Sequence, residues 1–342
     1  MKKKLQQTPM KEMMRMKLNK TLLIDGSYLL HRSLKVPDIY EMENSKGEKT
    51  GGIFQFIRSL QFEIKKHGAY FPIVCMDAGL SERRVELYDN YKKRLDRKER
   101  PPISELSGEE NKEREEEKEY LEEYRRQRAE VMDFLEYVGI PSIREKGWEG
   151  DDLLYIISRD CKESIIVTDD RDLLQLLDEN VYVSRPIADE FWTLEEFLEE
   201  YDYDDIQEFV IKKAIEGDKS DNIPQVAKGV GEVNAKRIAK LIYNSDSEEE
   251  YLKELSKSDS ILDERFVDNH KAFKRNLKLI DLSYVDISDY ILDAVESEID
   301  YTAGNIDYFK ALSFLDEKEI TNINLDAIIS NLNRLVKEND LN

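Results

Sequence analysis

Acidic residues recur in this sequence at the points where hydrophobic runs end. Short apolar runs of this length, separated by helical patterns, are typical of buried strands. Two other acidic groups open or precede helical patterns. The strand-like runs end in Asp25, Asp77 and the cluster 169–172, and the other two groups are 149–152 and 217–222.

These acids would meet if the runs formed one parallel sheet, because the carboxyl ends of parallel strands share an edge where ligands bind. Carboxylates gathered there repel each other strongly unless cations neutralise them. Hard oxygen ligands select magnesium or manganese. We therefore predict a two-metal site for phosphodiester chemistry at this edge.

Each acidic pair, taken alone, has a structural interpretation. Glu149 and Asp152 share a helix face, as do Asp218 and Asp221, and acids at helix starts are favoured by capping and by the helix dipole. The recurrence of the pattern after several strands favours the metal site. Asp169 is interpreted as a turn or capping residue, not as a ligand.

The order of apolar patterns predicts an α/β fold with a mostly parallel twisted sheet and helices on both faces. Strands are expected near 21–25, 71–77, 139–143, 164–168 and 181–184. Helices are expected at 51–66, Asp151 to about Arg159, and Asp172–Leu177. We divide the chain into a basic tail (1–20), a core (21–215) with a helical insertion at about 80–130, and a helical C-terminal region (216–342).

Composition narrows the class of protein. Three histidines and two cysteines make a histidine-based zinc site, a Ser-His-Asp triad or a disulfide framework improbable. No apolar run approaches the roughly 20 residues of a membrane span, so no membrane association is expected. A reducing cytoplasm suits this cysteine usage, which would be the host cell cytoplasm if the chain is phage-encoded.

The net charge of −22 argues against DNA binding, but basic residues are concentrated in one stretch. The stretch 83–100 is basic and includes Tyr88, Tyr91, Lys92 and Arg94, which offer stacking faces and phosphate donors. A solvated charged helix is the alternative. The Glu-rich run 109–123 is interpreted as a solvated face or spacer without chemistry.

A Gly229-Val230-Gly231 turn opens a helical pattern containing Lys236 and Arg237. Backbone amides at such a turn can hold a phosphate without reading a base. An ordinary connection between two helices is the alternative interpretation.

Taken in order, these motifs resemble the 5′-nuclease (flap endonuclease) family, with spacing most like its phage ribonuclease H or 5′-3′ exonuclease branch. Segment 23–27 is similar to the family's first strand, and 149–152 to its Glu-Ala-Asp-Asp motif, with Gly150 in place of alanine. Segments 168–177 and 217–224 resemble the Asp-x-Asp and Gly-Asp-x-x-Asp-Asn motifs. Segment 88–92 resembles the start of the helical arch, and 274–282 a C-terminal element.

The resemblance implies a PIN-like nuclease core and assigns roles to particular residues. Lys92 and an arch arginine, Arg94 or Arg97, would contact the scissile phosphate. The implied metal ligands are Asp25, Asp77, Glu149, Asp151, Asp152, Asp170, Asp172, Asp218 and Asp221. The expected nucleic-acid contacts are Arg84, Tyr88, Tyr91, Lys228, Gly229, Gly231, Lys236 and Arg237.

The implied activity is metal-dependent, structure-specific 5′-3′ exonuclease and flap endonuclease cleavage, with ribonuclease H-type removal of RNA primers in phage DNA replication. The expected cofactors are two Mg²⁺ ions, which Mn²⁺ can replace, and a monovalent cation at the Gly229–Gly231 hairpin. The expected partners are DNA and RNA–DNA duplexes with a 5′ end or flap, together with a single-strand-binding protein or sliding clamp. The chain is expected to act as a monomer.

Two alternatives remain open at this point. A PIN-domain ribonuclease would share the sheet and the acidic cluster, but the long insertion and the Gly-x-Gly hairpin argue against it. A non-catalytic DNA-binding replication accessory protein would not need all nine acids.

Overall fold

The sheet at the centre of the molecule has six strands. The computed structural model describes residues 18–93 and 107–339. The strands lie in the order β3-β2-β1-β4-β5-β6. Their bounds are β1 Lys20–Asp25, β2 Phe71–Cys75, β3 Ser142–Ile143, β4 Glu163–Val167, β5 Val181–Arg185 and β6 Glu190–Trp192.

Strand pairing confirms the predicted mostly parallel sheet. β1 pairs in parallel with β2 and with β4, placing Asp25 opposite Cys75 and Ile24 opposite Val167. β6 is antiparallel to β5 and was not predicted, because its three residues are too short to show a pattern. Since the chain order reverses on either side of β1, the ligand-binding crevice is expected at the carboxyl end of β1.

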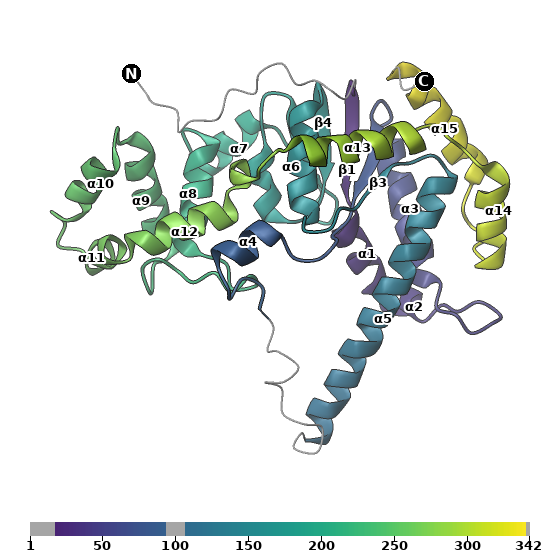
Figure 1. Cartoon of the computed structure of the whole chain (residues 1–342), viewed down its shortest axis with the longest axis horizontal. Coiled ribbons are helices and arrows are strands. Elements are labelled where there is room, and N and C mark those ends of the chain that lie inside the picture. Colours follow the sequence, from purple (N-terminus) through teal and green to yellow (C-terminus); the bar gives the residue numbers. More distant parts are fainter. Residues whose placement is uncertain (1–17, 94–106, 340–342) are drawn as a thin grey trace.

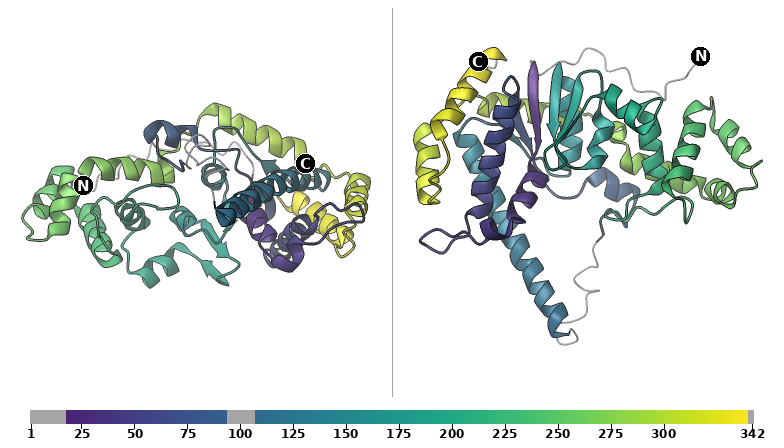
Figure 2. Two further views of the ribbon diagram at one scale, coloured as in Figure 1. Left: turned by 90° about the horizontal axis from the view of Figure 1, so that it is seen from below. Right: turned by 180° about the vertical axis from the view of Figure 1, so that it is seen from behind.

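Helices cover both faces of the sheet, as predicted. α1 (Gly26–Leu34) and α3 (Gly51–Lys66) lie on one face, while α6 (Gly150–Asp160) and α13 (Asp289–Thr302) lie on the other (Figures 1 and 2). The short α2 spans Pro37–Tyr40. The strands that the helices cover are buried along almost their whole length, which explains their continuous apolar runs.

The insertion contains two helices of very different length. α4 (Glu82–Leu87) packs beside α12, whereas α5 (Gly108–Tyr137) extends well away from the sheet (Figure 1). α5 begins with a Ser107–Glu110 capping box, and its Glu-rich first half is largely exposed, as expected for a solvated face. Arg94 and Arg97 lie outside the described residues.

The C-terminal helices divide between two cores, which the sequence did not distinguish. Helices α8 to α12 surround a separate apolar cluster that includes Ala214, Ile238 and Phe266. Helices α13 to α15 instead pack with the sheet through residues such as Leu332. The remaining bounds are α7 Leu194–Tyr201, α8 Ile206–Glu216, α9 Glu232–Asn244, α10 Glu248–Leu255, α11 Ile261–Asp268, α12 His270–Ile280, α14 Tyr308–Glu317 and α15 Leu325–Glu338.

Two short elements are 3₁₀ helices, η2 (Arg171–Leu176) and η3 (Leu282–Tyr284). The predicted helix at Asp172–Leu177 is therefore a tighter 3₁₀ turn, in which Asp170 caps the first turn by accepting the Asp172 amide. Among the residues that the structure describes, no helix is long and apolar enough to span a membrane.

Candidate active site

Asp25 lies at the centre of the carboxyl edge of the sheet. Its side chain caps α1 by accepting the Tyr28 amide at 3.0 Å, and it accepts the Thr168 hydroxyl from the end of β4 at 2.9 Å. Only 7% of the residue is exposed. The hydrogen bonds fix the carboxylate at the junction of β1 and β4, where the chain order reverses.

The electrostatics at this edge are those of crowded carboxylates. Burial raises the pKa of Asp25 to about 7, and the nearby Asp77 and Asp170 contribute to the rise. Burial also raises the pKa of Asp151 well above its usual range, reinforced by Asp170 and Asp25. Four predicted ligands therefore lie close enough to perturb one another, and a bound cation would relieve their repulsion.

Asp77 is joined to the start of α6. Its Oδ1 atom accepts the Gly150 amide at 2.6 Å, and its own amide donates to the Ser27 hydroxyl at 2.8 Å. A Cβ atom at Gly150 would lie 3.2 Å from Asp77 Oδ1, a tight contact. Glycine at this position allows the helix start to approach the carboxylate closely.

Glu149 faces the insertion. Its carboxylate lies 3.2 Å from the Lys92 ammonium and accepts the Tyr91 hydroxyl at 2.8 Å. The Lys92 ammonium also lies 3.7 Å from Asp221. Burial alone would lower the pKa of Lys92, but Glu149 and Asp221 raise it above its usual value, so the side chain stays charged. The structure thus brings the predicted catalytic lysine to the acidic edge.

Asp152 and Arg84 form a buried ion pair, which bears on the predicted roles of both residues. Two guanidinium nitrogens of Arg84 each lie 2.9 Å from a different Asp152 oxygen, and both residues are at most 4% exposed. Asp152 also accepts the Glu149 amide, and Arg84 donates to the Leu279 carbonyl. Arg84 also lies 3.0 Å from a Glu149 oxygen, so it pairs with two predicted ligands, and the role of Asp152 as a metal ligand stays a prediction. The predicted nucleic-acid contact by Arg84 is wrong in this structure, because its guanidinium is buried.

The second carboxylate group lies around η2 and the loop after α8. Lys213, which the sequence analysis missed, lies 2.5 Å from Asp172. Burial raises the pKa of Asp172 to about 6, against the effect of Lys213. Asp218 behaves differently, because hydrogen bonds from the Ser220 hydroxyl and amide outweigh its burial and lower its pKa. A lysine on an amphipathic helix gives no local signal that it faces a carboxylate.

The donor set suits a hard divalent cation. Its predicted members are carboxylates, and burial raises the pKa values of Asp25, Asp151, Asp172 and Asp221. Among residues 18–93 and 107–339, no group of three acidic, histidine or cysteine side chains is arranged to hold a metal ion. The fit therefore rests on the donor types of the predicted ligands, which suit an oxygen-coordinated metal, with Lys92 and Lys213 supplying positive charge beside them.

Asp169 lies in the loop after β4 and its side chain holds the turn between β5 and β6. It accepts the Tyr28 hydroxyl and the backbone amides of Ile187 and Ala188. These contacts agree with its interpretation as a turn residue. Asp170, its neighbour, is exposed toward the carboxylate edge.

We expect Asp170→Asn to reduce the turnover of a 5′-flap substrate strongly while leaving the thermal midpoint nearly unchanged. Asp169→Asn should do the reverse and lower the midpoint by several degrees, because an amide cannot accept all three hydrogen bonds. Turnover at saturating metal and thermal unfolding of both variants check this expectation. Equal losses of turnover per folded molecule would show that the register of this motif is wrong.

The described part of the basic stretch packs largely against the protein. Tyr91 is 3% exposed and lies in a small core with Ile223 and Leu279, so its predicted stacking role is wrong in this structure. Tyr88 is half-buried, with the Arg275 guanidinium 4.3 Å from its ring centre. Local sequence suggested an exposed stripe, but these contacts depend on segments more than 100 residues away.

The predicted hairpin connects α8 to α9. The Gln225 side chain holds it by donating to the Val230 carbonyl at 3.1 Å and accepting the Gly229 amide at 3.2 Å. Gly229 and Lys228 are exposed, with the Lys228 carbonyl accepting Arg265. These positions leave the outer surface of the hairpin open to a phosphate backbone.

The positive φ of this hairpin is at Gly229, not at Gly231. Gly229 has φ +87°, whereas Gly231 caps α9 with φ −95°, which any residue adopts. A β-branched residue at Gly231 would therefore not strain the turn, whereas one at Gly229 would. Nothing lies within 4 Å of a Cβ atom built at either glycine, so conformation decides the effect of a substitution.

We expect Gly229→Val to weaken nicked-duplex binding, because valine resists the left-handed region. The matched variant Gly231→Val should bind nearly as the unmodified protein does. Fluorescence anisotropy with a nicked duplex, without cleavage, measures both. Unchanged affinity for Gly229→Val would remove the hairpin from the duplex contact.

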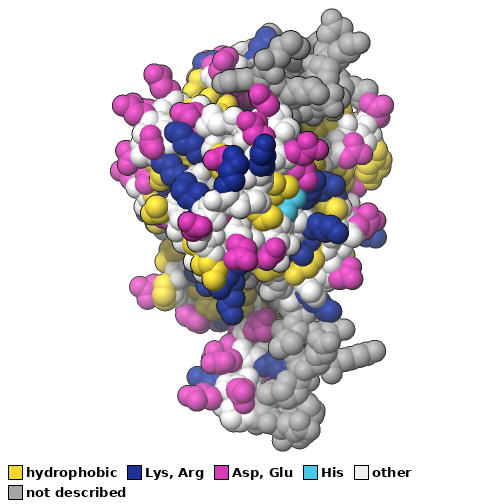
Figure 3. Space-filling view, turned by 90° about the vertical axis from the view of Figure 1, so that its left-hand side faces the viewer, with side chains coloured by type: hydrophobic (Ala, Val, Ile, Leu, Met, Phe, Trp, Pro, Cys, Tyr) yellow, Lys and Arg dark blue, Asp and Glu magenta, His cyan; other side chains and the backbone are white. Residues whose placement is uncertain are grey.

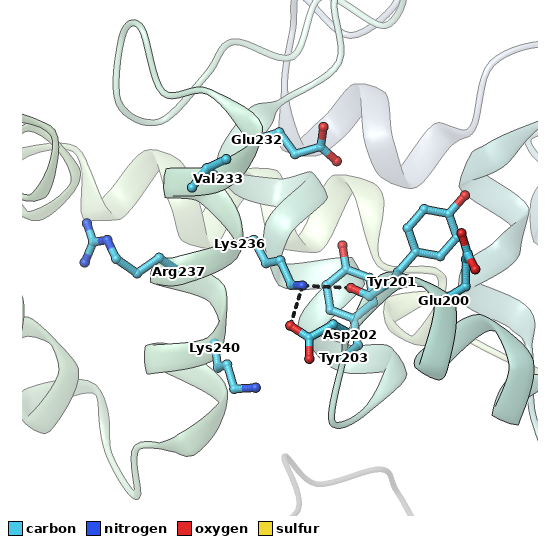
Figure 4. A pocket seen from close by; sticks show the side chains of 9 residues that line it. All are labelled: Glu200, Tyr201, Asp202, Tyr203, Glu232, Val233, Lys236, Arg237 and Lys240. Atoms are coloured by element: carbon cyan, nitrogen blue, oxygen red, sulfur yellow. Dashed lines mark hydrogen bonds and ion pairs between the residues drawn. The ribbon is translucent and has the colours of Figure 1, made fainter.

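Lys236 and Arg237 are engaged within the protein. Figure 4 shows both on α9, lining a pocket of about 540 Å³ opposite the corner between α7 and α8. The Lys236 ammonium lies 2.9 Å from Asp202, and Arg237 pairs with Asp263. On the end of the molecule drawn in Figure 3, several basic side chains lie together on the upper part of the face, with acidic side chains among and around them. The expectation that Lys236 and Arg237 contact nucleic acid stays a prediction, and such contacts would require these surface ion pairs to open.

The fold and the site together define a nuclease: a parallel sheet with carboxylates and a lysine at its carboxyl edge, a helical insertion beside them and a helical hairpin nearby. Residues 20–207 match the family model described as the 5′-3′ exonuclease, N-terminal resolvase-like domain. The chain belongs to the 5′-3′ exonuclease family and has the nuclease class of activity.

Individual relatives agree with this family. The chain is 30% identical over 226 residues to a 5′-3′ exonuclease of Aquifex aeolicus, covering 65% of this chain and 69% of the relative. It is also 30% identical over 271 residues to the thermostable DNA polymerase I of Thermus thermophilus. That match covers 78% of this chain but only 28% of the polymerase.

Solved structures support the fold. A bacteriophage T5 5′-exonuclease with bound zinc aligns with a TM-score of 0.62 and 21% identity, covering 82% of this chain and 98% of that one. A T5 flap endonuclease in a complex with DNA and metal ions aligns with a TM-score of 0.59 and 20% identity, covering 93% of this chain and 100% of that one.

Proposed function

We propose that this chain is a magnesium-dependent, structure-specific 5′-nuclease that removes 5′ flaps and RNA primers during DNA replication. The observation that carries the proposal is the charged Lys92 beside Glu149 and Asp221, at an edge where Asp25 and Asp151 have raised pKa values. Such an edge combines metal ligands with a cation for the phosphate. The T5 neighbours are described with divalent metal ions and, in one complex, with DNA. These descriptions support the proposal of a metal-dependent reaction on DNA.

Mg²⁺, or Mn²⁺ in its place, would be held by the open carboxylates and would stabilise the attacking and leaving oxygens of an in-line displacement. Asp25, Asp77, Glu149, Asp151 and Asp170 form the group nearest the sheet edge. Asp172, Asp218 and Asp221 form the second group, and Lys213 on α8 pairs with Asp172. Asp152 stays a proposed ligand of the first group, although its carboxylate, like that of Glu149, is paired with Arg84 in this structure.

Lys92 is the residue of this chain best placed to stabilise charge on the scissile phosphate. Its ammonium is held at the acidic edge and its environment keeps it protonated. When a phosphate replaces the carboxylate contacts, the same positive charge can stabilise the developing negative charge of the transition state. Arg94, in the same arch, remains a proposed second contact.

Substrate selection would combine two elements. The exposed outer surface of the hairpin around Lys228 and Gly229 would grip the duplex without reading its sequence, with a monovalent cation as a proposed aid, while the insertion would receive the single-stranded 5′ end. Because few cations around the hairpin are unengaged, duplex affinity should depend only shallowly on salt, with a slope of about 0.9 per phosphate contact. The proposed partner in replication is a single-strand-binding protein or a sliding clamp, and the proposed location is the cytoplasm of a phage-infected host cell.

The test is cleavage of labelled 5′-flap, nicked-duplex, RNA–DNA and single-stranded RNA substrates with and without Mg²⁺. The proposal predicts metal-dependent cleavage near the flap junction and little cleavage of single-stranded RNA. Preferential cleavage of single-stranded RNA would favour the PIN-type ribonuclease instead. Binding of the flap without any cleavage would favour a non-catalytic accessory protein.

A further inference from the structure

The foot of the arch, defined here as residues 88–93, is clasped by the loop 218–222. The Asn222 side-chain amide donates to the carbonyl of Asn90 at 3.2 Å and to that of Lys93 at 2.9 Å. Between these two carbonyls, the Lys92 amide donates to the Asp221 carbonyl at 3.0 Å. Three hydrogen bonds therefore fix the backbone that carries Lys92.

The backbone of Lys92 needs such support. Lys92 has φ +46°, in the left-handed region that is unfavourable for a lysine. Unfavourable backbone conformations persist where the surrounding structure holds them. Asn222 itself has φ +59°, which asparagine tolerates well, so its side chain can be presented to the arch foot at little cost.

We propose that Asn222 is a positioning residue, which holds the arch foot so that the Lys92 ammonium points at the carboxylate edge. The inference rests on the proposed function, because it assigns Lys92 to the scissile phosphate. The same loop continues through Ile223 and Pro224 into the hairpin that contains Gly229, so the clasp links the proposed duplex grip to the catalytic lysine along the chain.

A purely conformational role for Asn222 is the competing explanation, because asparagine favours a positive φ. Asn222→Gly separates the two roles, since glycine adopts positive φ freely but lacks the amide that clasps the arch foot. Asn222 is exposed and its substitution opens no cavity in a core. Asn269→Gly is the matched control, because it also removes an exposed asparagine amide, one that donates to the Arg265 carbonyl between α11 and α12 and not to the arch foot.

The experiment combines activity with a measurement that does not need cleavage. We expect Asn222→Gly to lower the single-turnover rate on a 5′-flap substrate by roughly 100-fold, since small misplacements of catalytic groups have effects of this size. Nicked-duplex affinity and the thermal midpoint should stay near those of Asn269→Gly. Hydrogen exchange at the Lys92 amide, measured without metal or DNA, should become faster in Asn222→Gly alone.

A double-mutant cycle identifies the residue through which Asn222 acts. In a Lys92→Ala background, Asn222→Gly should cost almost nothing further, because no ammonium remains to be positioned. The same full loss in that background would overturn the inference while leaving the proposed function intact. If the unmodified protein cleaved no flap, the proposed function would fail, and unchanged exchange at the Lys92 amide would separately overturn the clasp.

Discussion

Asp151→Asn should reduce 5′-flap cleavage by on the order of 1,000-fold while leaving the fold and duplex binding intact. The reason is that Asp151 lies among Asp25, Asp77 and Asp170, where burial and like charges raise its pKa and a cation is most needed. Asparagine keeps the shape but removes the charge that holds the metal. Steady-state turnover over a range of Mg²⁺ concentrations measures the loss.

Asp152→Asn is the informative control for this first expectation. Because Asp152 forms a buried ion pair with Arg84, the substitution leaves the guanidinium incompletely neutralised and should lower the thermal midpoint. Comparing the thermal midpoints of the two variants shows how much each carboxylate contributes to stability, apart from its effect on turnover. A stable Asp151→Asn protein with full turnover at low Mg²⁺ would remove Asp151 from the ligand set.

Lys92→Ala should lower the single-turnover cleavage rate by roughly 100- to 1,000-fold, with a much smaller effect on duplex affinity. Its ammonium lies 3.2 Å from Glu149 and 3.7 Å from Asp221, at the position where a phosphate would meet the metal ligands. Rapid-mixing cleavage assays and binding titrations on the same flap substrate distinguish the two effects.

Lys93→Ala provides the matched control, since it removes the same charge from the next residue, which is exposed. It should leave the cleavage rate within a few-fold of the unmodified protein. If both variants lost affinity equally and cleavage at saturating enzyme were unchanged, Lys92 would be a phosphate anchor and not a catalytic residue.

The sheet could be predicted because its strands are buried apolar runs that end in acids. Asp25 and Asp77 follow β1 and β2 directly, and the parallel register brings them together. The motif residues around Asp170 and Asp218 could also be located, because turn and capping chemistry is local. Lys92 was found for a related reason, since it stands in a basic stretch of an acidic chain.

The errors concern contacts between distant segments. The local sequence predicted Arg84 and Tyr91 to be exposed arch residues, but α12 and the start of α6 bury them. Asp152 pairs with Arg84 in the same set of contacts. Lys213 gave no local signal at all. The sequence also did not show that the positive φ lies at Gly229 or that Lys236 pairs with Asp202. Both features depend on how α8 and α9 meet the rest of the chain.

The most direct test of the central claim is the position and metal dependence of cleavage on a 5′-labelled flap substrate. The carboxylate edge and Lys92 predict one dominant product, cut near the junction with Mg²⁺ or Mn²⁺ and absent with a chelator. Cleavage that continued unchanged in the presence of a chelator would contradict the account.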